Sequence, residues 1–252
     1  MTDRFAKYPS LAGRTVLVTG GASGIGADMA RAFAANQAKV AVLDIDTVAG
    51  EALASETAGT LFLRCDMLDI PALQAAIATA ACQLGPISAL INNAANDDRR
   101  KVEEVDPAYW DWSQAVNLKH QFFAAQAVHS QMKELGGGSI VNLSSIAWRF
   151  GADEMTPYVT AKSAVIGLTR ALARKFGPDN IRVNAIEPGA VMTEKQRKIW
   201  YPTQEAVDAI VNRQLVRKML TGDDIARLAL FLASDDARMI TKQSFVVDAG
   251  LA

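Results

Sequence analysis

The sequence predicts a single α/β domain, spanning residues 1–252, built on a doubly wound parallel sheet. Short apolar runs of strand type alternate with helical patterns along the whole chain, which is typical of right-handed strand–helix–strand units. The first apolar run leads into a glycine-rich turn that opens a helical pattern. With 252 residues, 50% of them hydrophobic, the chain can bury one large core.

The elements follow from the hydrophobic pattern. We expect strands at 14–19, 39–43, 60–64, 87–91, 139–143, 181–186 and 244–247, and helices at about 24–35, 47–58, 70–84, 107–135, from 156 onward, and 222–233. The strand runs are β-branched and nearly continuously apolar, as expected of strands covered on both faces. Thr156 is a plausible cap and Pro157 suits the first turn of the helix that follows.

One stretch, about 190–217, breaks this alternation. It is rich in charge and carries Trp200, Tyr201 and Pro202 after the carboxyl end of an expected strand. Ligands of such sheets bind outside those ends, so we interpret the stretch as a substrate lid. The alternative is an ordinary helical hairpin on the surface.

Composition narrows the function classes. A net charge of −1 gives no basic field that would favour nucleic acid or an anionic membrane. Cys65 and Cys82 have neither metal-ligand nor disulfide-framework spacing, and His120 and His129 are isolated, so we expect no metal. The first residues lack the apolar region of a signal peptide, and no apolar run is long enough for a transmembrane helix. These features predict a cytoplasmic protein.

The glycine-rich turn predicts a dinucleotide site. Gly20, Gly24 and Gly26 lie between a strand and a helix, which is the context that a phosphate-binding loop requires. Glycines permit a tight turn and a close approach of the backbone. The helix start supplies free N–H groups and a positive dipole end for a pyrophosphate.

Asp44 predicts which dinucleotide binds. It ends the second strand, 18 residues after Gly26, where a carboxylate can accept hydrogen bonds from a ribose 2′-OH and would repel a 2′-phosphate. No arginine replaces Ser23 or follows Asp44. We therefore expect NAD, with NADP less favoured. The alternative role of Asp44, capping the next helix, is partly served by Asp46 or Thr47.

A tyrosine and a lysine indicate the chemistry. Tyr158 and Lys162 are four residues apart and project from one face of a helix. An ammonium beside a phenol favours the phenolate, which can take a proton from an alcohol. Ser144 and Ser145 follow a neighbouring strand, where a hydroxyl can hold the same alcohol. The alternative is a surface ion pair of no catalytic importance.

Together these motifs resemble the short-chain dehydrogenase/reductase family, whose fold is of Rossmann type, over nearly the whole chain. The run Asn92–Ala95 is similar to the Asn-Asn-Ala-Gly strand end of that family, with Ala95 in place of the last glycine. That methyl group narrows the space beside the nicotinamide. Family members carry a serine 13 positions before the tyrosine, which selects Ser145 rather than Ser144.

The resemblance implies roles for individual residues. Asn117, Ser145, Tyr158 and Lys162 match the catalytic tetrad, in which Lys162 also holds the nicotinamide ribose and Asn117 positions a water. The cofactor residues that it implies are Gly20, Ser23, Gly24, Ile25, Asp44, Asp66, Met67, Asn93, Ala94, Ala95, Tyr158, Lys162, Pro188, Gly189, Val191 and Thr193.

Three segments (96–101, 148–151 and 193–201) are similar to bacterial aldose 1-dehydrogenases. Polar groups beside an indole suit a sugar, which presents hydroxyl edges and an apolar face. The substrate residues implied are Asn96, Ser145, Trp148, Tyr158, Gln196 and Trp200. Parts of these segments have alternative roles: Asn96 as a turn residue, Trp148 in the core, and the 99–101 run as a solvated face.

The expected function is therefore NAD-dependent oxidation of an aldose at C1 to the lactone, with Tyr158 as base. The expected substrate is a pentose such as L-arabinose or D-xylose, or a related sugar such as L-fucose or D-galactose. The alternatives are another alcohol or ketone, such as a polyol or an oxoacyl thioester, and a nucleotide-binding sensor without turnover. A homotetramer is expected, since family members are commonly tetramers and the segment 245–252 is apolar.

Overall fold

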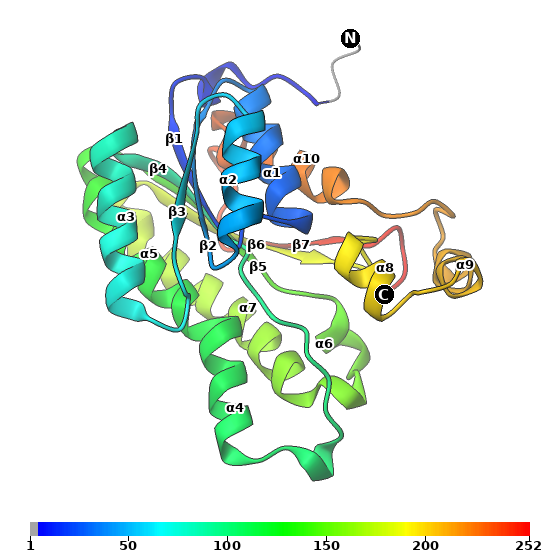
Figure 1. Cartoon of the computed structure of the whole chain (residues 1–252). Helices are drawn as coiled ribbons and strands as arrows, with labels where there is room; N and C mark the ends of the chain where they lie inside the picture. Colours follow the sequence, from blue (N-terminus) through cyan, green and yellow to red (C-terminus); the bar gives the residue numbers. More distant parts are fainter. Residues whose placement is uncertain (1–4) are drawn as a thin grey trace.

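The computed structural model describes residues 5–252, which form one α/β domain around a seven-stranded sheet (Figure 1). All strand pairs are parallel, in the order β3-β2-β1-β4-β5-β6-β7. The strands are β1 (Thr15–Thr19), β2 (Lys39–Asp44), β3 (Thr60–Arg64), β4 (Ile87–Asn92), β5 (Gly138–Leu143), β6 (Ile181–Pro188) and β7 (Ser244–Val247). The doubly wound sheet that the alternation predicted is confirmed.

The helices cover both faces of this sheet. They are α1 (Gly24–Ala35), α2 (Thr47–Glu56), α3 (Ile70–Leu84), α4 (Pro107–Gln114), α5 (His120–Glu134), α6 (Ala147–Phe150), α7 (Thr156–Phe176), α8 (Glu194–Ile199), α9 (Gln204–Arg213) and α10 (Gly222–Ala233). One core cluster joins one sheet face to α1, α2 and α10, and a second joins the opposite face to α3, α5 and α7. Each strand is thereby shielded from water on both sides, which explains its continuous apolar sequence.

The strand order creates the site for a ligand. From β1 the chain builds outward to β3, then crosses back through α3 to β4 on the other side of β1. Parallel sheets open a crevice at such a reversal, outside the carboxyl ends of the strands. The loops after β1, β4, β5 and β6 all end at this edge of the sheet.

One long helix differs from its expected form. The pattern predicted a continuous helix over about 107–135, but α4 and α5 are separated by a π-helical stretch, Ala115–Lys119, with the buried Asn117 at its centre. The buried positions around the insertion are Ser113, Asn117, His120 and Gln121, which keep helical spacing, so periodicity alone could not reveal it. Such π-turns are frequent at functional sites because they redirect backbone groups.

Two helix starts were predicted at the level of single residues. Asp46 caps α2, since its side chain accepts a hydrogen bond from the Ala49 N–H at 3.0 Å. That leaves Asp44 free of the capping role. The expectation that Thr156 caps α7 was wrong by one position, because Thr156 is already helical and Met155 precedes it.

The part of the chain that the structure describes contains no helix long and apolar enough to cross a bilayer. Over the same residues, no three side chains of His, Cys, Asp or Glu come together as a metal site. The segment at 190–217 is folded as the short helices α8 and α9, and it lies at the edge of the sheet where the crevice opens (Figure 1).

Candidate active site

A cavity of about 1120 Å³ opens at the carboxyl ends of the central strands. Every residue for which the sequence implied a cofactor role lines this cavity, from Gly20 in the first loop to Thr193 beyond β6. Gly20 and Thr193, the first and last of these residues, are more than 170 positions apart in the sequence and face the same cavity.

The glycine-rich loop is shaped by contacts that leave no room for side chains. A Cβ on Gly20 would lie 2.6 Å from the Ala94 Cα, and one on Gly26 would meet the Gly20 carbonyl oxygen. Gly24 has a φ of +52°, which side chains rarely adopt, and a Cβ there would lie 3.2 Å from Thr193 Cγ2. Each would obstruct the cradle at the start of α1.

The start of α1 retains free donors. Ser23 occupies the N-cap position, but its side chain makes no capping hydrogen bond. Its hydroxyl and the first N–H groups of this 12-residue helix are thus available on the cavity wall. A pyrophosphate binds to free N–H donors at a helix start, so the geometry of this loop fits a dinucleotide.

Asn93 fixes the loop to β4. Its side chain donates to the backbone oxygens of Thr19 (3.0 Å) and Gly20 (2.8 Å), and its N–H donates to Thr19 Oγ1 at 3.0 Å. The glycine-rich turn and the Asn-Asn-Ala-Ala strand end are therefore one rigid unit.

Asp44 lines the cavity at the end of β2. One carboxylate oxygen accepts from the Ala22 N–H at 2.9 Å and the other from the Asp46 N–H at 3.1 Å. A carboxylate offers about four acceptor positions, so both oxygens can take a further donor from the cavity. Arg64 stands opposite Asp44 in the strand register but does not line the cavity.

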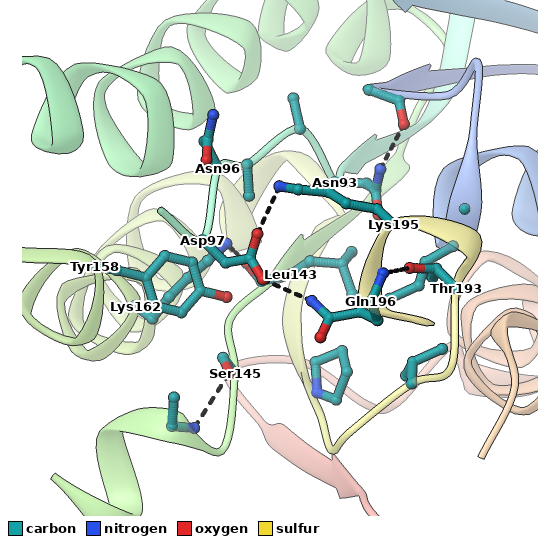
Figure 2. A pocket seen from close by; sticks show the side chains of 18 of the residues that line it. Asn93, Asn96, Asp97, Leu143, Ser145, Tyr158, Lys162, Thr193, Lys195 and Gln196 are labelled. Carbon is teal, nitrogen blue, oxygen red and sulfur yellow. Dashed lines mark hydrogen bonds and ion pairs between the residues drawn. The ribbon is translucent and has the colours of Figure 1, made fainter. Parts of the chain in front are cut away.

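Ser145, Tyr158 and Lys162 come together beneath the loop (Figure 2). Lys162 Nζ lies 5.6 Å from the centre of the Tyr158 ring and donates to the Leu143 carbonyl at 2.8 Å. Ser145 lies close enough to Tyr158 to lower the pKa of the phenol. The arrangement places a hydroxyl, a phenol and an amine around one position in the cavity, as the sequence spacing predicted.

The two adjacent serines have different surroundings. Ser144 is buried and its hydroxyl donates to the backbone oxygen of Lys162 at 2.6 Å. Ser145 faces the cavity, and its Oγ accepts from the Ala147 N–H at 3.1 Å. Ser144 thus ties β5 to α7, whereas Ser145 presents its hydroxyl to a ligand.

The protonation of the pair differs from the sequence-based expectation. Burial raises the pKa of Tyr158 above its usual value, and the nearby Ser145 hydroxyl only partly opposes this. Burial also lowers the pKa of Lys162 to about 7, although the negative charge of Asp97 acts in the opposite direction. We expected Lys162 to hold the Tyr158 pKa down, but desolvation dominates both groups in the structure.

Asn117 does not line the cavity. Its side chain holds the backbone of Asn96, accepting from the Asn96 N–H at 2.9 Å and donating to the Asn96 carbonyl at 3.0 Å. Its own carbonyl accepts from the Gln121 side chain at 3.3 Å. The direct contribution of Asn117 is to fix the loop that follows β4.

The residues with an implied substrate role are only partly brought together. Asn96 and Gln196 line the cavity, while Trp148 and Trp200 do not. The Trp148 indole donates to the buried carboxylate of Glu187 at 2.8 Å, which draws it away from the cavity. The Trp200 indole donates to Asp97 at 3.2 Å, so Trp200 supports the cavity wall from behind.

Sequence reasoning missed the role of Asp97. It lines the cavity and accepts hydrogen bonds from Lys195 and Gln196 of α8, as Figure 2 shows. A signal was present, because Asp97 follows the β4 strand end directly and polar residues at that edge face the crevice. Nothing in the sequence showed that its partners lie nearly 100 residues further along.

A parallel sheet with a cavity at its strand reversal, a phosphate-shaped loop and a Ser–Tyr–Lys group defines an oxidoreductase that uses a nicotinamide dinucleotide. Residues 20–252 match the family model described as enoyl-(acyl carrier protein) reductase. The chain belongs to the short-chain dehydrogenase/reductase family.

Relatives of known name cover the whole chain. The chain is 45% identical over 256 residues to the "Probable galactose dehydrogenase GalD" of Rhizobium meliloti, covering 100% of both proteins. It is 44% identical over 249 residues to the D-xylose 1-dehydrogenase of Caulobacter vibrioides, covering 97% of this chain and 98% of the relative. A crystal structure assigned as a short-chain alcohol dehydrogenase from Sinorhizobium meliloti superposes with a TM-score of 0.90, at 36% identity over 96% of this chain and 98% of that chain.

Proposed function

We propose that the enzyme oxidises an aldose at C1 to the lactone, using NAD. One observation carries this proposal: a single cavity is lined both by Ser145, Tyr158 and Lys162 and by the polar side chains of Asp97 and Gln196. The first three groups handle the reacting hydroxyl, and the others suit the remaining hydroxyls of a sugar. The similarity to proteins named for galactose and D-xylose supports an aldose.

The chain's own residues divide the chemistry as follows. Tyr158 removes the proton of the anomeric hydroxyl, and Ser145 hydrogen-bonds the same oxygen. Lys162 favours the phenolate whenever it is charged. Bound NAD supplies the acceptor for the hydride leaving C1. Asn117 keeps the wall beside the reacting carbon in place through Asn96.

The cofactor contacts follow from the cavity lining. The start of α1, with Ser23, Gly24 and Ile25, would hold the pyrophosphate. Asp66 and Met67 would face the adenine, and the segment from Pro188 to Thr193 would face the nicotinamide, since all of them line the same cavity. Ala95 is exposed on the same wall, so its methyl narrows the space rather than closing it.

The preference for NAD over NADP rests on Asp44. Its two oxygens each retain an acceptor position, which a ribose 2′-OH can use and a 2′-phosphate cannot. Arg64 does not line the cavity, so no described arginine beside Asp44 is placed to neutralise a phosphate there.

The experiment that tests the proposal is NAD and NADP reduction with a panel of aldoses, polyols and hydroxyacyl thioesters. We expect turnover with a pentose or with D-galactose or L-fucose, and a lactone as product. Tyr158→Phe, in the same panel, should lose at least about 10²-fold in kcat while still binding NAD. Retention of a tenth of the wild-type kcat would exclude Tyr158 as the base. Turnover with polyols or thioesters alone would replace the aldose by that class.

We also propose a homotetramer. Exposed apolar side chains near the end of the chain, among them Met239 and Val246, offer surface for a second copy. Light scattering at micromolar concentration tests this, and a monomer would contradict it.

A further inference from the structure

The carboxylate of Asp97 is the point at which α8 closes on the cavity. Lys195 Nζ donates to its Oδ1 at 2.6 Å, and Gln196 Nε2 donates to its Oδ2 at 2.6 Å (Figure 2). Trp200 Nε1 donates to Oδ2 at 3.2 Å. All three donors come from one short stretch of the segment interpreted as a lid.

The position of this carboxylate is fixed from both sides. The backbone of the preceding Asn96 is held by Asn117 through two hydrogen bonds. On the far side, the Arg99 guanidinium stacks on the Trp200 ring at 3.7 Å, which secures the indole that donates to Asp97. A polar group held in this way does not reorganise when a ligand arrives, so its orientation can discriminate between ligands.

Asp97 still has capacity for one more donor. A carboxylate has about four acceptor positions, and three are taken by Lys195 and Gln196 of α8 and by Trp200, which follows that helix. The side chain lines the cavity and retains 18% exposure. Within residues 5–252, Gln196 Oε1 accepts no hydrogen bond, and in Figure 2 it points away from Asp97. The site thus offers two free acceptors beside the ammonium group of Lys195.

Asp97 also lies within reach of the reacting groups. In Figure 2 it stands beside the Tyr158 ring, between Tyr158 and Gln196. Burial raises the pKa of Tyr158 and lowers that of Lys162, and the negative charge of Asp97 acts on both groups by raising the pKa. A second substrate hydroxyl, close to the one that Tyr158 deprotonates, would therefore meet this carboxylate.

We propose that Asp97 is a specificity-determining residue, whose carboxylate accepts a hydrogen bond from a substrate hydroxyl other than the one oxidised. Lys195 and Gln196 hold the carboxylate in the position from which it accepts this hydrogen bond. The inference rests on the proposed oxidation of a sugar. A site built for a hydroxyl rejects an analogue that lacks it, because the buried polar group is then left without its partner.

The test compares the preferred aldose with its monodeoxy analogues. In the wild-type enzyme, one deoxy position should lower kcat/KM by roughly 10–100-fold. In Asp97→Ala the same loss should shrink to within about 3-fold, since the residue that reads the hydroxyl is gone. Asp97→Asn, which keeps an uncharged acceptor, should give an intermediate loss and serves if the alanine variant does not fold.

Two control variants distinguish two roles of Asp97: binding a substrate hydroxyl, and anchoring α8 over the cavity. Asp98→Asn removes a carboxylate at the next residue, which does not line this cavity, and should keep the full deoxy penalty. Lys195→Met weakens the contact with α8 but retains the carboxylate, so it should lower kcat/KM for all the sugars while preserving the penalty.

The outcomes are distinct. If Asp97→Ala and Asp97→Asn lower kcat/KM equally for the sugar and every deoxy analogue, Asp97 only anchors α8 and the inference is wrong, while sugar oxidation stands. If the wild-type enzyme reduces NAD with no aldose of the panel, the proposed function and this inference both fail.

Discussion

The side chain of Asn117 forms two hydrogen bonds with the backbone of Asn96, one to its N–H and one to its carbonyl. This pairing lies between the π-helical stretch and the loop after β4, and it determines where Asp97 stands. Buried backbone groups are costly to leave without partners. Beyond the end of β4, no strand in the described part of the chain pairs with the backbone of Asn96. The amide side chain of Asn117 supplies the two hydrogen bonds instead.

Asn117→Ala should destabilise the protein and weaken catalysis together. Losing the partners of two backbone groups costs about 1–3 kcal/mol for each group that remains buried. For a chain of this size the melting temperature should fall by several degrees. Differential scanning calorimetry and kcat/KM measure the two effects. A variant with wild-type melting temperature and activity would show that the loop after β4 keeps its conformation without the hydrogen bonds from Asn117.

Ser144 and Ser145 form a matched pair. Ser145→Ala should lower kcat by about 10²-fold or more with little change in melting temperature, because its hydroxyl faces the cavity. Ser144→Ala removes the hydrogen bond to the Lys162 carbonyl, so it should lower stability by about 1 kcal/mol and kcat much less. The reverse pattern would assign the reacting hydroxyl to Ser144. Steady-state kinetics and thermal unfolding of both variants decide between them.

The cofactor preference should depend on Asp44. A hydrogen bond to a charged group contributes about 1.5–3 kcal/mol, so we expect kcat/KM to favour NAD over NADP by roughly 10–100-fold. Asp44→Ala should erode most of this preference. Asp46→Ala is the control, since it removes a helix cap two residues away and should cost about 1 kcal/mol of stability without changing the preference. Equal wild-type kcat/KM values for NAD and NADP would contradict the assignment.

Lys162 should make the cofactor-free protein more stable at alkaline pH. Burial lowers the pKa of its ammonium from 10.5 to about 7. Below about pH 7 the lysine is charged in both states, and the folded protein bears the full cost of the buried charge. Between these pKa values the unfolded chain holds the proton and the folded chain does not, so stability rises with pH.

Lys162→Met provides the measurement. Groups far from position 162 titrate alike in both proteins, so the difference in melting temperature reports on the lysine and its immediate neighbours. Relative to the wild type, the variant should be at its most stable at about pH 6 and should lose that advantage toward about pH 10. A difference that does not vary with pH would mean that Lys162 keeps its ordinary pKa in the folded protein.

The sequence predicted the sheet and the strand ends from local pattern, whereas the resemblance to the family implied most of the residues that line the cavity. Each β-strand is a short apolar run, and the residue just beyond it faces the crevice whatever the rest of the chain does. The capping role of Asp46 was likewise readable, since an Asp at a helix start has few other uses.

What the sequence could not supply depends on contacts between distant residues. The π-turn at Asn117 adds a residue to a helix whose buried positions still recur every three or four residues. The direction of Trp148 is determined by the buried carboxylate of Glu187, 39 positions later. The pKa of Lys162 reflects how completely the surrounding elements exclude water, a property of the assembled core rather than of the four-residue spacing to Tyr158.

Glu187 has a consequence for the end of the chain. Its fully buried carboxylate binds Arg149 through two hydrogen bonds and also accepts from Trp148, both in α6, two turns at most from Ser145. On the other side it accepts from the Ser244 hydroxyl, at the first residue of β7. A displacement of β7 would leave this buried charge short of a partner and loosen α6. Ser145, for which we propose a catalytic role, is thereby linked through α6 and Glu187 to the last strand, so a partner that packs against β7 should also restrain this side of the cavity.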